Sequence, residues 1–487
     1  SAFIPAIEHG INGFLCESSD DWTRSLTSLV NSTELRHKIG SAAYSSILEH
    51  YSPENIAKSQ LLPIVNKLHS RPQNKTRLLS VNIYYAPQSF GGATIVAEET
   101  NKILNTCEDF DVSVFTALPL EMLSAYDLRR YEVDGINIFG FGLPPTLSPK
   151  EQFENSNAIA PFEKVLSAVK PDIVHLHSIQ GIGISIINLC IEKQIKFVIT
   201  LHDAWWICGR QFMINKQSKY CNQKTINLDT CDICVDDASL NRDRQLKLNS
   251  ILNQATLLLS PSQFFADLYI KNNIPSEKIV VNKNGVLRPK QPPLRLRHKG
   301  PLTFCYVGGN TEIKGINVIK NAFTKLPISD IKLTIVDNMT NLGFSSFKKQ
   351  FFEGIDNVEI VPAYNQKTID DFFSGIDVLL FPTQWKESFG LTIREALARN
   401  VWVIVTDAGA VTEDIIDGKN GLIIPFDDKG NGLVKAIQKT VMFFESFEIG
   451  SEVQFENKKI TWFSDQSAEL ANIYKQVLNK NVIIQPL

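Results

Sequence analysis

The chain has 487 residues, of which 44% are hydrophobic and 21% are charged; this length and composition predict a globular protein of roughly two to four domains. The formal net charge of −3 excludes a basic field directed at nucleic acid or at a membrane surface. The sequence shows no apolar run near the roughly 20 residues that cross a bilayer and no signal-peptide pattern. We therefore expect a protein of the reducing cytoplasm.

Residues 1–72 contain a short pattern that returns near the other end of the chain. EHGINGFL at 8–15 and IDGKNGLI at 416–423 both have the form x-x-Gly-x-Asn-Gly-apolar-apolar. After each, an aromatic-Ser step opens a helix-like stretch, at 51–62 and at 463–474. Chance is the alternative, because Asn-Gly turns are common. We interpret the N-terminal segment as the end of an upstream lobe of the same kind, belonging to a longer parent chain.

Residues 76–285 alternate between short apolar, β-branched runs and helix-like segments. This alternation predicts a doubly wound, parallel sheet. The expected strands lie at 77–85, 112–117, 173–177, 196–202 and 256–262. Residues 286–300 then carry five Arg or Lys and no acid. The prolines of this stretch disfavour regular structure, so we expect a linker.

A second alternation occupies residues 301–460. Its expected strands lie at 302–308, 331–337, 358–364, 378–383, 401–406 and 420–425. The sequence therefore predicts an α/β protein with two Rossmann-like lobes that face a cleft. That cleft is the expected ligand site, because open α/β sheets bind ligands at the carboxyl ends of their strands. Residues 461–487 are expected to form a C-terminal helix that packs back on the first lobe.

The segment KESFGLTIREAL, at 386–397, carries the strongest chemical signal. Glu387 and Glu395 are eight positions apart and flank Ser-Phe-Gly-Leu. A helix starting near Gly390 would turn its free N–H groups toward an anion, and the carboxylates could accept hydrogen bonds from sugar hydroxyls. The alternative is a surface helix with ordinary exposed glutamates.

The context of this segment favours the first interpretation. VLLFPTQW precedes it and ALARNVWVIVTDAGAVTEDIIDGKNGLIIP follows it. The whole stretch resembles the retaining glycosyltransferases of family 4, which have the two-lobed GT-B fold. The resemblance implies that Glu387 contacts the donor sugar and Glu395 the ribose of a UDP- or GDP-sugar. It also implies that the amides around Phe389, Gly390 and Leu391 meet the sugar and the distal phosphate.

Two glycine-containing loops fit the same family. Gly91 and Gly92, in PQSFGGATIVAEE, would let a backbone loop approach the donor diphosphate; most Gly-Gly pairs, however, are only turns. Lys314, in VGGNTEIKG, matches the family lysine that pairs with donor phosphates; the alternative is a solvated loop lysine. The family usually has an Arg five residues before this lysine, and here Gly309 stands in its place.

Polar side chains follow two expected strands of the first lobe. His177 ends DIVHLH and matches the family position near the transferred sugar. His202 and Asp203 follow the next strand and resemble a step on the acceptor side in one branch of the family. A lone His at a strand end is more often a structural group. Their presence at two strand ends favours a functional role.

Retention, which the resemblance implies, sets the expected mechanism. The departing nucleoside diphosphate gathers negative charge, which Lys314, the Gly91–Gly92 loop and the helix after Gly390 would stabilise. His177, Glu387 and Lys314 are the expected catalytic residues. Because no positioned nucleophile is evident, we expect a front-side displacement. No Asp-x-Asp motif is evident near the first sheet, so we expect neither a catalytic metal nor another cofactor.

Four of the eight cysteines lie close together in the sequence. Cys208, Cys221, Cys231 and Cys234 follow the spacing C-x12-C-x9-C-x2-C. The Cys-x2-Cys end suits tetrahedral zinc, with the other two cysteines completing the ligand set. The alternative is a loop of free or redox-labile thiols.

The leading functional hypothesis is transfer of a sugar from a nucleotide-sugar to a glycan or lipid-linked glycan in bacterial surface polysaccharide synthesis. The basic residues of 288–299 could bring the enzyme to anionic lipid at the inner face of the plasma membrane; a solvated linker is the alternative. A second hypothesis is a non-catalytic nucleotide- or glycan-binding module of a larger glycosyltransferase. An oxidoreductase is disfavoured, because GIGISI at 181–186 lacks the third glycine of GxGxxG.

Overall fold

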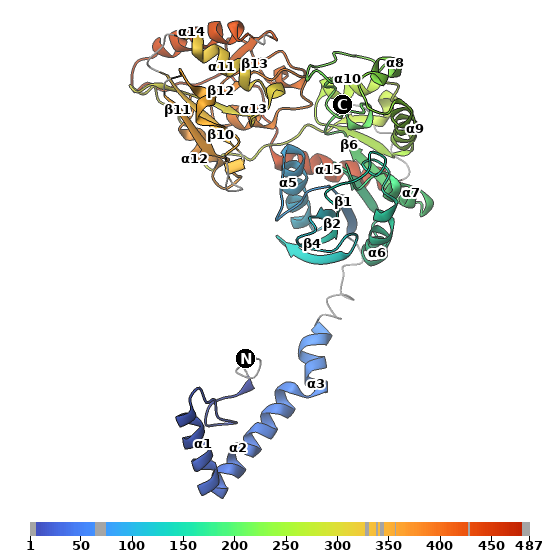
Figure 1. Ribbon diagram of the computed structural model, residues 1–487, viewed down its shortest axis with the longest axis vertical. Coiled ribbons are helices and arrows are strands. Elements are labelled where there is room, and N and C mark those ends of the chain that lie inside the picture. Colours follow the sequence, from blue (N-terminus) through green and yellow to red (C-terminus); the bar gives the residue numbers. More distant parts are fainter. Residues whose placement is uncertain are drawn as a thin grey trace. The chain divides into compact units, whose positions relative to one another are not determined.

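The computed structural model describes residues 6–63, 75–326, 331–337, 339–340, 345–355, 357–426 and 429–479. The chain forms two compact units, Ser1–Lys75 and Thr76–Leu487, and the larger unit contains two β-sheets (Figure 1). Within the described ranges, no helix combines the length and the apolar character that are needed to cross a bilayer.

The first sheet of the larger unit has eight strands in the order β3-β4-β2-β1-β5-β6-β7-β8. Their bounds are β1 (Thr76–Val81), β2 (Phe110–Leu118), β3 (Leu128–Val133), β4 (Ile136–Gly142), β5 (Ile173–Leu176), β6 (Lys196–Thr200), β7 (Leu257–Ser260) and β8 (Ile279–Val281). All neighbours run parallel except β3 and β4. The chain first builds outward from β1 on one side and then starts β5 on the other. This order places a topological switch point between β1 and β5.

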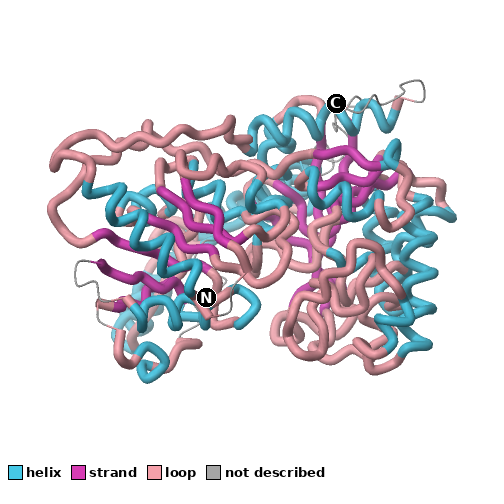
Figure 2. The backbone as a smooth tube through the Cα atoms, turned by 90° about the horizontal axis from the view of Figure 1, so that it is seen from above, coloured by secondary structure: helices cyan, strands magenta, loops and turns pink. Residues whose placement is uncertain are grey.

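Helices cover the faces of this sheet, which explains why its central strands are apolar runs. β5 and β7 are buried at every position, as expected for a parallel sheet covered on both faces. Figure 2 shows helices beside the strands of each lobe. The helices of the first lobe are α5 (Gly92–Thr106), α6 (Ile159–Val169), α7 (Ser185–Glu192), α8 (Leu228–Asp232), α9 (Ala238–Gln254) and α10 (Gln263–Ile270).

The second sheet has six parallel strands in the order β11-β10-β9-β12-β13-β14. Its strands are β9 (Leu302–Val307), β10 (Ile331–Asp337), β11 (Val358–Pro362), β12 (Val378–Phe381), β13 (Trp402–Thr406) and β14 (Gly421–Ile424). The helices of this lobe are α11 (Ile316–Lys325), α12 (Ile369–Ser374), α13 (Leu391–Leu397) and α14 (Asn431–Glu445). The chain again reverses direction across the sheet, here between β9 and β12. Each lobe therefore has one switch point next to its first strand.

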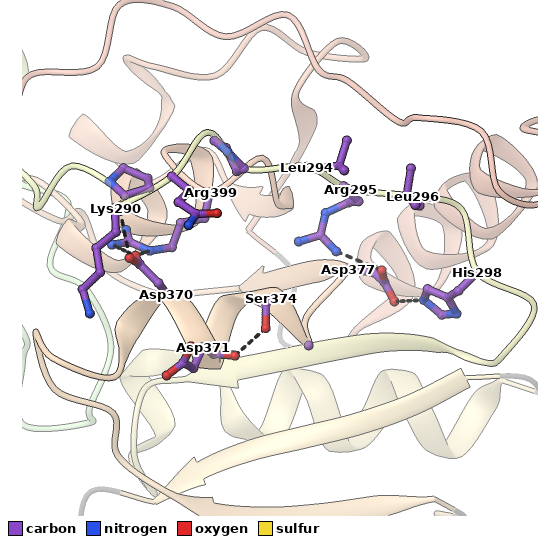
Figure 3. A pocket seen from close by; sticks show the side chains of 14 residues that line it. Lys290, Leu294, Arg295, Leu296, His298, Asp370, Asp371, Ser374, Asp377 and Arg399 are labelled. Carbon is purple, nitrogen blue, oxygen red and sulfur yellow. Dashed lines mark hydrogen bonds and ion pairs between the residues drawn. The ribbon is translucent and has the colours of Figure 1, made fainter.

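The linker at 286–300 is irregular, as its prolines predict, but it is not simply solvated. The Arg295 side chain is 8% exposed, and its Nη1 lies 3.0 Å from Asp377 Oδ1. His298 Nε2 lies 3.0 Å from the other oxygen of the same carboxylate, and Figure 3 shows both side chains reaching from the linker toward Asp377. Arg297 donates to the carbonyl of Phe444. Part of the basic charge expected to meet solvent or lipid is therefore used to fasten the linker to the second lobe.

The helix α15 (Phe463–Leu478) returns from the second lobe to the first. Figure 1 shows it beside α5. Tyr474 is 1% exposed and stacks edge-on against Phe110 of β2, and Lys475 Nζ lies 2.6 Å from Asp109 Oδ2. Residues 480–487 of the expected C-terminal helix lie outside the described residues.

The smaller unit repeats a turn of the second lobe, hydrogen bond for hydrogen bond. In each copy the first glycine donates to the carbonyl of the last glycine, at 2.7 and 2.8 Å. The asparagine oxygen accepts from an N–H four residues earlier, at 2.7 and 2.8 Å, and its nitrogen donates to a carbonyl six residues earlier, at 3.2 and 3.1 Å. The matched residues are Gly10 with Gly418, Asn12 with Asn420, and Gly13 with Gly421.

The surroundings of the two copies differ. The smaller unit continues as α1 (Ser19–Asn31), α2 (Thr33–Ser46), α3 (Pro53–Ile56) and two π-helical turns, Ile47–Tyr51 and Ala57–Leu61. Among its described residues only Ile39 is a buried apolar side chain. Trp22, Leu26 and Val30 form one face of α1 and are 58%, 52% and 74% exposed. In α14, by contrast, Leu433 and Ile437 are fully buried.

Candidate active site

The expected site residues follow the strands that flank the two switch points. Gly91 comes after β1 as the N-cap of α5, Gly92 is the first residue of α5, and His177 comes directly after β5. Lys314 follows β9, and Glu387 follows β12. Because the carboxyl ends of neighbouring parallel strands lie at one edge of a sheet, each lobe brings its own pair together.

Contacts between the lobes join these two edges. A Cβ atom on Gly92 would lie 3.8 Å from Leu391 Cδ2 at the start of α13. Ser388 Oγ donates to the carbonyl of His202, at 2.6 Å, and Ser262 Oγ donates to the carbonyl of Ser388, at 2.7 Å. The Gly91–Gly92 loop, His202 and the segment after Glu387 therefore meet at one place between the lobes.

Lys314 and Glu387 form the central ion pair of the second lobe. Lys314 Nζ lies 2.8 Å from Glu387 Oε1, and the two side chains are 31% and 8% exposed. Thr383 Oγ1 donates to the same oxygen, at 3.2 Å. Gly315 has a φ of +89°, and a Cβ there would lie 2.1 Å from the carbonyl oxygen of Pro382. Only glycine lets the lysine turn pack this closely against the chain that follows β12.

The helix α13 begins at Leu391, as predicted, with Gly390 at a φ of +84° as its N-cap. Arg394 anchors this start from inside the lobe: its side chain is 2% exposed and its Nε lies 2.6 Å from Asp414 Oδ2. The same guanidinium donates to the carbonyl groups of Phe389 and Ala410. The hydrogen bonds that this one buried arginine donates to three different residues hold the backbone around the motif in place.

Glu395 is 3% exposed. Its Oε2 accepts from the hydroxyl of Tyr364, at 2.6 Å, and its Oε1 from Gln366 Nε2, at 3.4 Å. Burial raises the pKa of this carboxyl, and the hydrogen bonds from Tyr364 and Gln366 oppose that rise. The long second contact leaves Oε1 with room to accept a hydrogen bond from a ligand hydroxyl.

Three histidines lie against one another at the first switch point. The rings of His175 and His177 are 3.9 Å apart, and His177 Nδ1 lies 3.0 Å from His202 Nε2. His175 is held between Tyr474 and Thr200, at 2.6 and 2.7 Å. His177 Nε2 is a buried atom with no hydrogen-bond partner in the described part of the chain. It is thus a polar atom that a ligand could satisfy.

Burial keeps these rings neutral. It lowers the pKa of His175 to about 3 and that of His202 to about 4, and it places the pKa of His177 well below its usual value. Between His177 and His202 a single proton can occupy the short contact, so one ring donates and the other accepts. The first edge of the site therefore gains no positive charge from its histidines near neutral pH.

Asp203 lies beside the site, but its carboxylate is already engaged. It accepts from Trp205 N at 2.8 Å, from Gln211 Nε2 at 2.7 Å and from Gln180 Nε2 at 3.3 Å. Burial raises its pKa, and the bond from Gln211 opposes this rise. Asp203 thus positions two glutamines that the sequence did not single out. Only their contact with Asp203 makes them conspicuous.

Gly91 and Gly309 both leave open space. Gly91 has a φ of +82° and Gly309 a φ of +66°, and a Cβ at either position would meet no atom within 4 Å. At Gly309, where the family usually has an Arg, the backbone carbonyl accepts from Tyr306 at 3.0 Å. Lys314 therefore supplies a cation at the second edge, and position 309 supplies none.

The four cysteines line one cavity of about 290 Å³. Among the residues that the structure describes, no group of three or more His, Cys, Asp or Glu side chains is placed to hold a metal ion. The structure therefore does not bring the ligands of the expected zinc site, Cys208, Cys221, Cys231 and Cys234, into a metal-binding arrangement.

The chain has two lobes, each built on a mostly parallel sheet, and the sheet edges at their switch points face each other. This is the architecture of a GT-B glycosyltransferase. The family described as "Glycosyltransferase Family 4" matches residues 90–286, and "Glycosyl transferases group 1" matches residues 288–441. The chain belongs to the family 4-like GT-B glycosyltransferases, and it is a glycosyltransferase. The fold class and the family resemblance predicted from the sequence are confirmed.

The chain is also similar to individual proteins. An "uncharacterized 41.2 kDa protein in cps region" of Klebsiella pneumoniae is 26% identical over 317 residues, which cover 61% of this chain and 83% of that protein. The lipopolysaccharide core biosynthesis mannosyltransferase LpsB of Rhizobium meliloti is 44% identical over 62 residues, 12% of this chain and 17% of LpsB. The structure of Anabaena HepE with UDP and glucose has a TM-score of 0.51 and 14% identity, covering 83% of this chain and 96% of HepE; at this identity it shows the fold alone.

Proposed function

We propose that the protein transfers a sugar, with retention, from a nucleoside-diphosphate donor to a glycan or lipid-linked glycan of a bacterial surface polysaccharide. The observation that carries this proposal is the Lys314–Glu387 pair, 2.8 Å apart at the switch point of the second sheet. HepE is described with UDP and glucose, and LpsB is named for lipopolysaccharide core biosynthesis. These names support the donor class and the pathway.

The two groups of the ion pair would contact different parts of the donor. Lys314 Nζ neutralises charge that gathers on the diphosphate as it departs. The carboxylate of Glu387 accepts hydrogen bonds from hydroxyls of the transferred sugar. Glu395, deeper along α13, would accept from the ribose through its less engaged Oε1. Gly91 and Gly92 leave space for the backbone to approach the diphosphate.

His177 would meet the sugar from the opposite lobe. Its unpartnered Nε2 accepts or donates one hydrogen bond, according to which ring of the His177–His202 pair carries the shared proton. We propose front-side displacement, with the acceptor oxygen attacking on the face that the diphosphate leaves. The departing phosphate oxygen then takes the acceptor's proton. No metal ion is needed in this scheme, and activity that EDTA abolishes would contradict it.

The test is a panel of UDP-, GDP- and ADP-sugars with the full chain, measuring nucleotide release with and without glycan acceptors. Lys314→Ala and Glu387→Ala are expected to abolish release from whichever donor is used. A matched control pair lies in the same lobe: Lys332 and Glu359 are 2.5 Å apart on the surface of β10 and β11. Lys332→Ala and Glu359→Ala should keep activity. Full activity in both site variants would overturn the assignment.

A non-catalytic nucleotide- or glycan-binding module is the second candidate function. Gly309 in place of the family's Arg is the observation that favours it. Under this alternative, the panel would give donor binding that Lys314→Ala weakens, but no nucleotide release with any acceptor.

We also propose that the smaller unit is the end of an upstream glycosyltransferase unit in a longer parent chain. The repeated turn and the exposed face of α1 support this origin, because the matching segment of the second lobe has a sheet to cover. A parent sequence without a second Glu-x7-Glu motif before Ser1 would contradict it.

A lipid-linked acceptor would require the enzyme to act at the inner face of the plasma membrane, and we propose this location together with that acceptor.

A further inference from the structure

We propose that a cavity in the first lobe binds the acceptor through an uncharged sugar and excludes acidic sugars and phosphates from that position. The inference rests on the proposed function, since it names the chemical class of the acceptor. The cavity has a volume of about 450 Å³, large enough for one or two sugar rings by comparison with small-ligand sites of roughly 300–1,000 Å³.

The cavity lies at the carboxyl ends of β1, β2, β4 and β5. Its walls come from Leu118, the last residue of β2, and from the segments that follow the strands, including Tyr84, Leu143 and Gln180. His177 is three residues before Gln180, so the cavity opens at the sheet edge that carries the histidine pair. This is the edge where a ligand of an open α/β sheet is expected.

The charge of the wall limits what the cavity can hold. Of the described residues that line it, none is Lys, Arg or His, and Glu121 is the only charged one. Proteins recognise carboxylates and phosphates mainly through Arg and Lys. A wall with one negative charge and no cation disfavours both groups electrostatically. An uncharged ligand meets no such penalty.

The polar part of the wall consists of amides. Gln180 and Gln211 each direct their amide nitrogen at Asp203, at 3.3 and 2.7 Å. A carboxylate can only accept hydrogen bonds, so the amide orientation is set and the two Oε1 atoms are directed away from Asp203. Gln88 and Gln152 add two further amides to the same wall. Oriented carbonyl oxygens are acceptors suited to sugar hydroxyls.

The remaining wall is apolar. Leucine and proline side chains form most of it, among them Leu118, Leu120, Leu143, Pro144, Pro145 and Leu147. A pyranose ring has hydroxyls around its rim and C–H groups on its faces. Amide acceptors beside an aliphatic surface match both features, and a few placed polar groups in an apolar wall are typical of small-molecule sites.

Matched glycosides test this inference with the full chain. The probes are the p-nitrophenyl β-glycosides of glucose and galactose and the corresponding glucuronide and galacturonide, which differ by one carboxylate. Binding is measured by calorimetry and saturation-transfer NMR. At least one neutral glycoside should bind with a dissociation constant about tenfold lower than that of its acidic counterpart, the size of effect expected for one unfavourable charge contact. Equal or tighter binding of the acids, or no binding of either neutral probe, would overturn the inference.

Two variants locate the binding. Gln211→Ala should weaken the neutral glycoside about threefold to tenfold through loss of one hydrogen bond, whereas Gln254→Ala, on the exposed side of α9, should not. Glu121 is exposed, so Glu121→Lys should fold normally and shift the preference toward the acid. If neither variant changes binding, the cavity is not the site. Nucleotide release from the donor is measured in parallel for the wild type and for Glu387→Ala. That comparison shows separately whether the proposed function itself has failed.

Discussion

The two switch points of this glycosyltransferase have opposite electrostatic characters. In the second lobe the edge carries Lys314, Glu387, Arg394 and Asp414, joined in ion pairs of 2.6–2.8 Å. In the first lobe the corresponding edge carries glycines, amides, histidines whose pKa values are lowered by burial, and one carboxylate, Asp203, but no Lys or Arg among the described residues named there. One edge therefore suits a diphosphate and the other an uncharged sugar. We propose on this basis that the donor diphosphate meets Lys314 of the second lobe and that the acceptor lies against the first lobe, whose Gly91–Gly92 loop also approaches the diphosphate.

Reversing the charge of the second edge should break this contrast most severely. In Lys314→Glu two carboxylates would face each other where the structure has an ion pair. We expect transfer to fall by on the order of 10³, since a cation that stabilises developing charge contributes about this much. The measurement is kcat/KM with the preferred donor. Lys332→Glu, on the surface of β10, is the control, and a similar loss there would point to general damage.

The histidines of the first edge should make stability depend on pH. Their pKa values in the folded chain are lowered, to about 3 for His175 and about 4 for His202. The unfolded chain therefore binds more protons, and stability is full above about pH 6.5 and is lost as the pH falls toward 4. A shift from 6.5 to 4 corresponds to about 3 kcal/mol.

Thermal melts between pH 7.5 and 4.5 check this prediction. His202→Gln should flatten the acid side of the profile while His37→Gln, on the exposed surface of α2, leaves it as in the wild type. A melting temperature of the larger unit that stays constant over this range would show that the first edge is not held neutral.

A weaker effect is expected at the contact that brings the two edges together. Lys283 of the first lobe lies 2.5 Å from Asp414, which also binds Arg394 behind the donor motif. Lys283→Met should raise the KM for the donor about twofold to fivefold, the range of a partly exposed ion pair. Lys475→Met removes a pair of similar length, 2.6 Å, between α15 and the first lobe. A larger change in that variant would mean that Lys283 has no special part in joining the edges.

The smallest effect is expected from the smaller unit. Both edges of the site lie within Thr76–Leu487, and the turn at 8–15 brings none of the site residues with it. A chain that starts at residue 76 should keep the kcat and KM of the full chain. Loss of activity on this deletion would show that residues 1–75 contribute to the site.

Much of this arrangement could be predicted from the sequence, because parallel strands covered on both faces are continuous apolar runs. All six strands of the second sheet lie where such runs predict them. In the first sheet β3, β4 and β8 were not predicted. β3 reads LRRYEV and lies at an edge with half of its positions exposed, and β8 has only three residues. Short or edge strands carry too little apolar signal to be recognised. β4 is neither short nor at an edge: INIFGFG is a buried strand of seven residues, and its two glycines are typical of turns and loops.

The same limit applies to the site. Glu387 and Lys314 could be found because their local motifs are distinctive, although their contact joins residues 73 positions apart. The supporting groups could not. Arg394 and Asp414 are unremarkable in sequence, and Gln180 and Gln211 matter only because Asp203 orients both. Their roles arise from tertiary contacts, which periodicity and composition do not encode.

The central claim is that the second edge binds the donor diphosphate through Lys314. The most direct measurement is calorimetric titration of the full chain with UDP, GDP and ADP, and with the matching nucleosides, for wild type and Lys314→Ala. We predict that one nucleoside diphosphate binds the wild type and loses about tenfold or more in affinity in Lys314→Ala, while binding of its nucleoside is unchanged. Equal diphosphate affinity in both proteins would contradict the account.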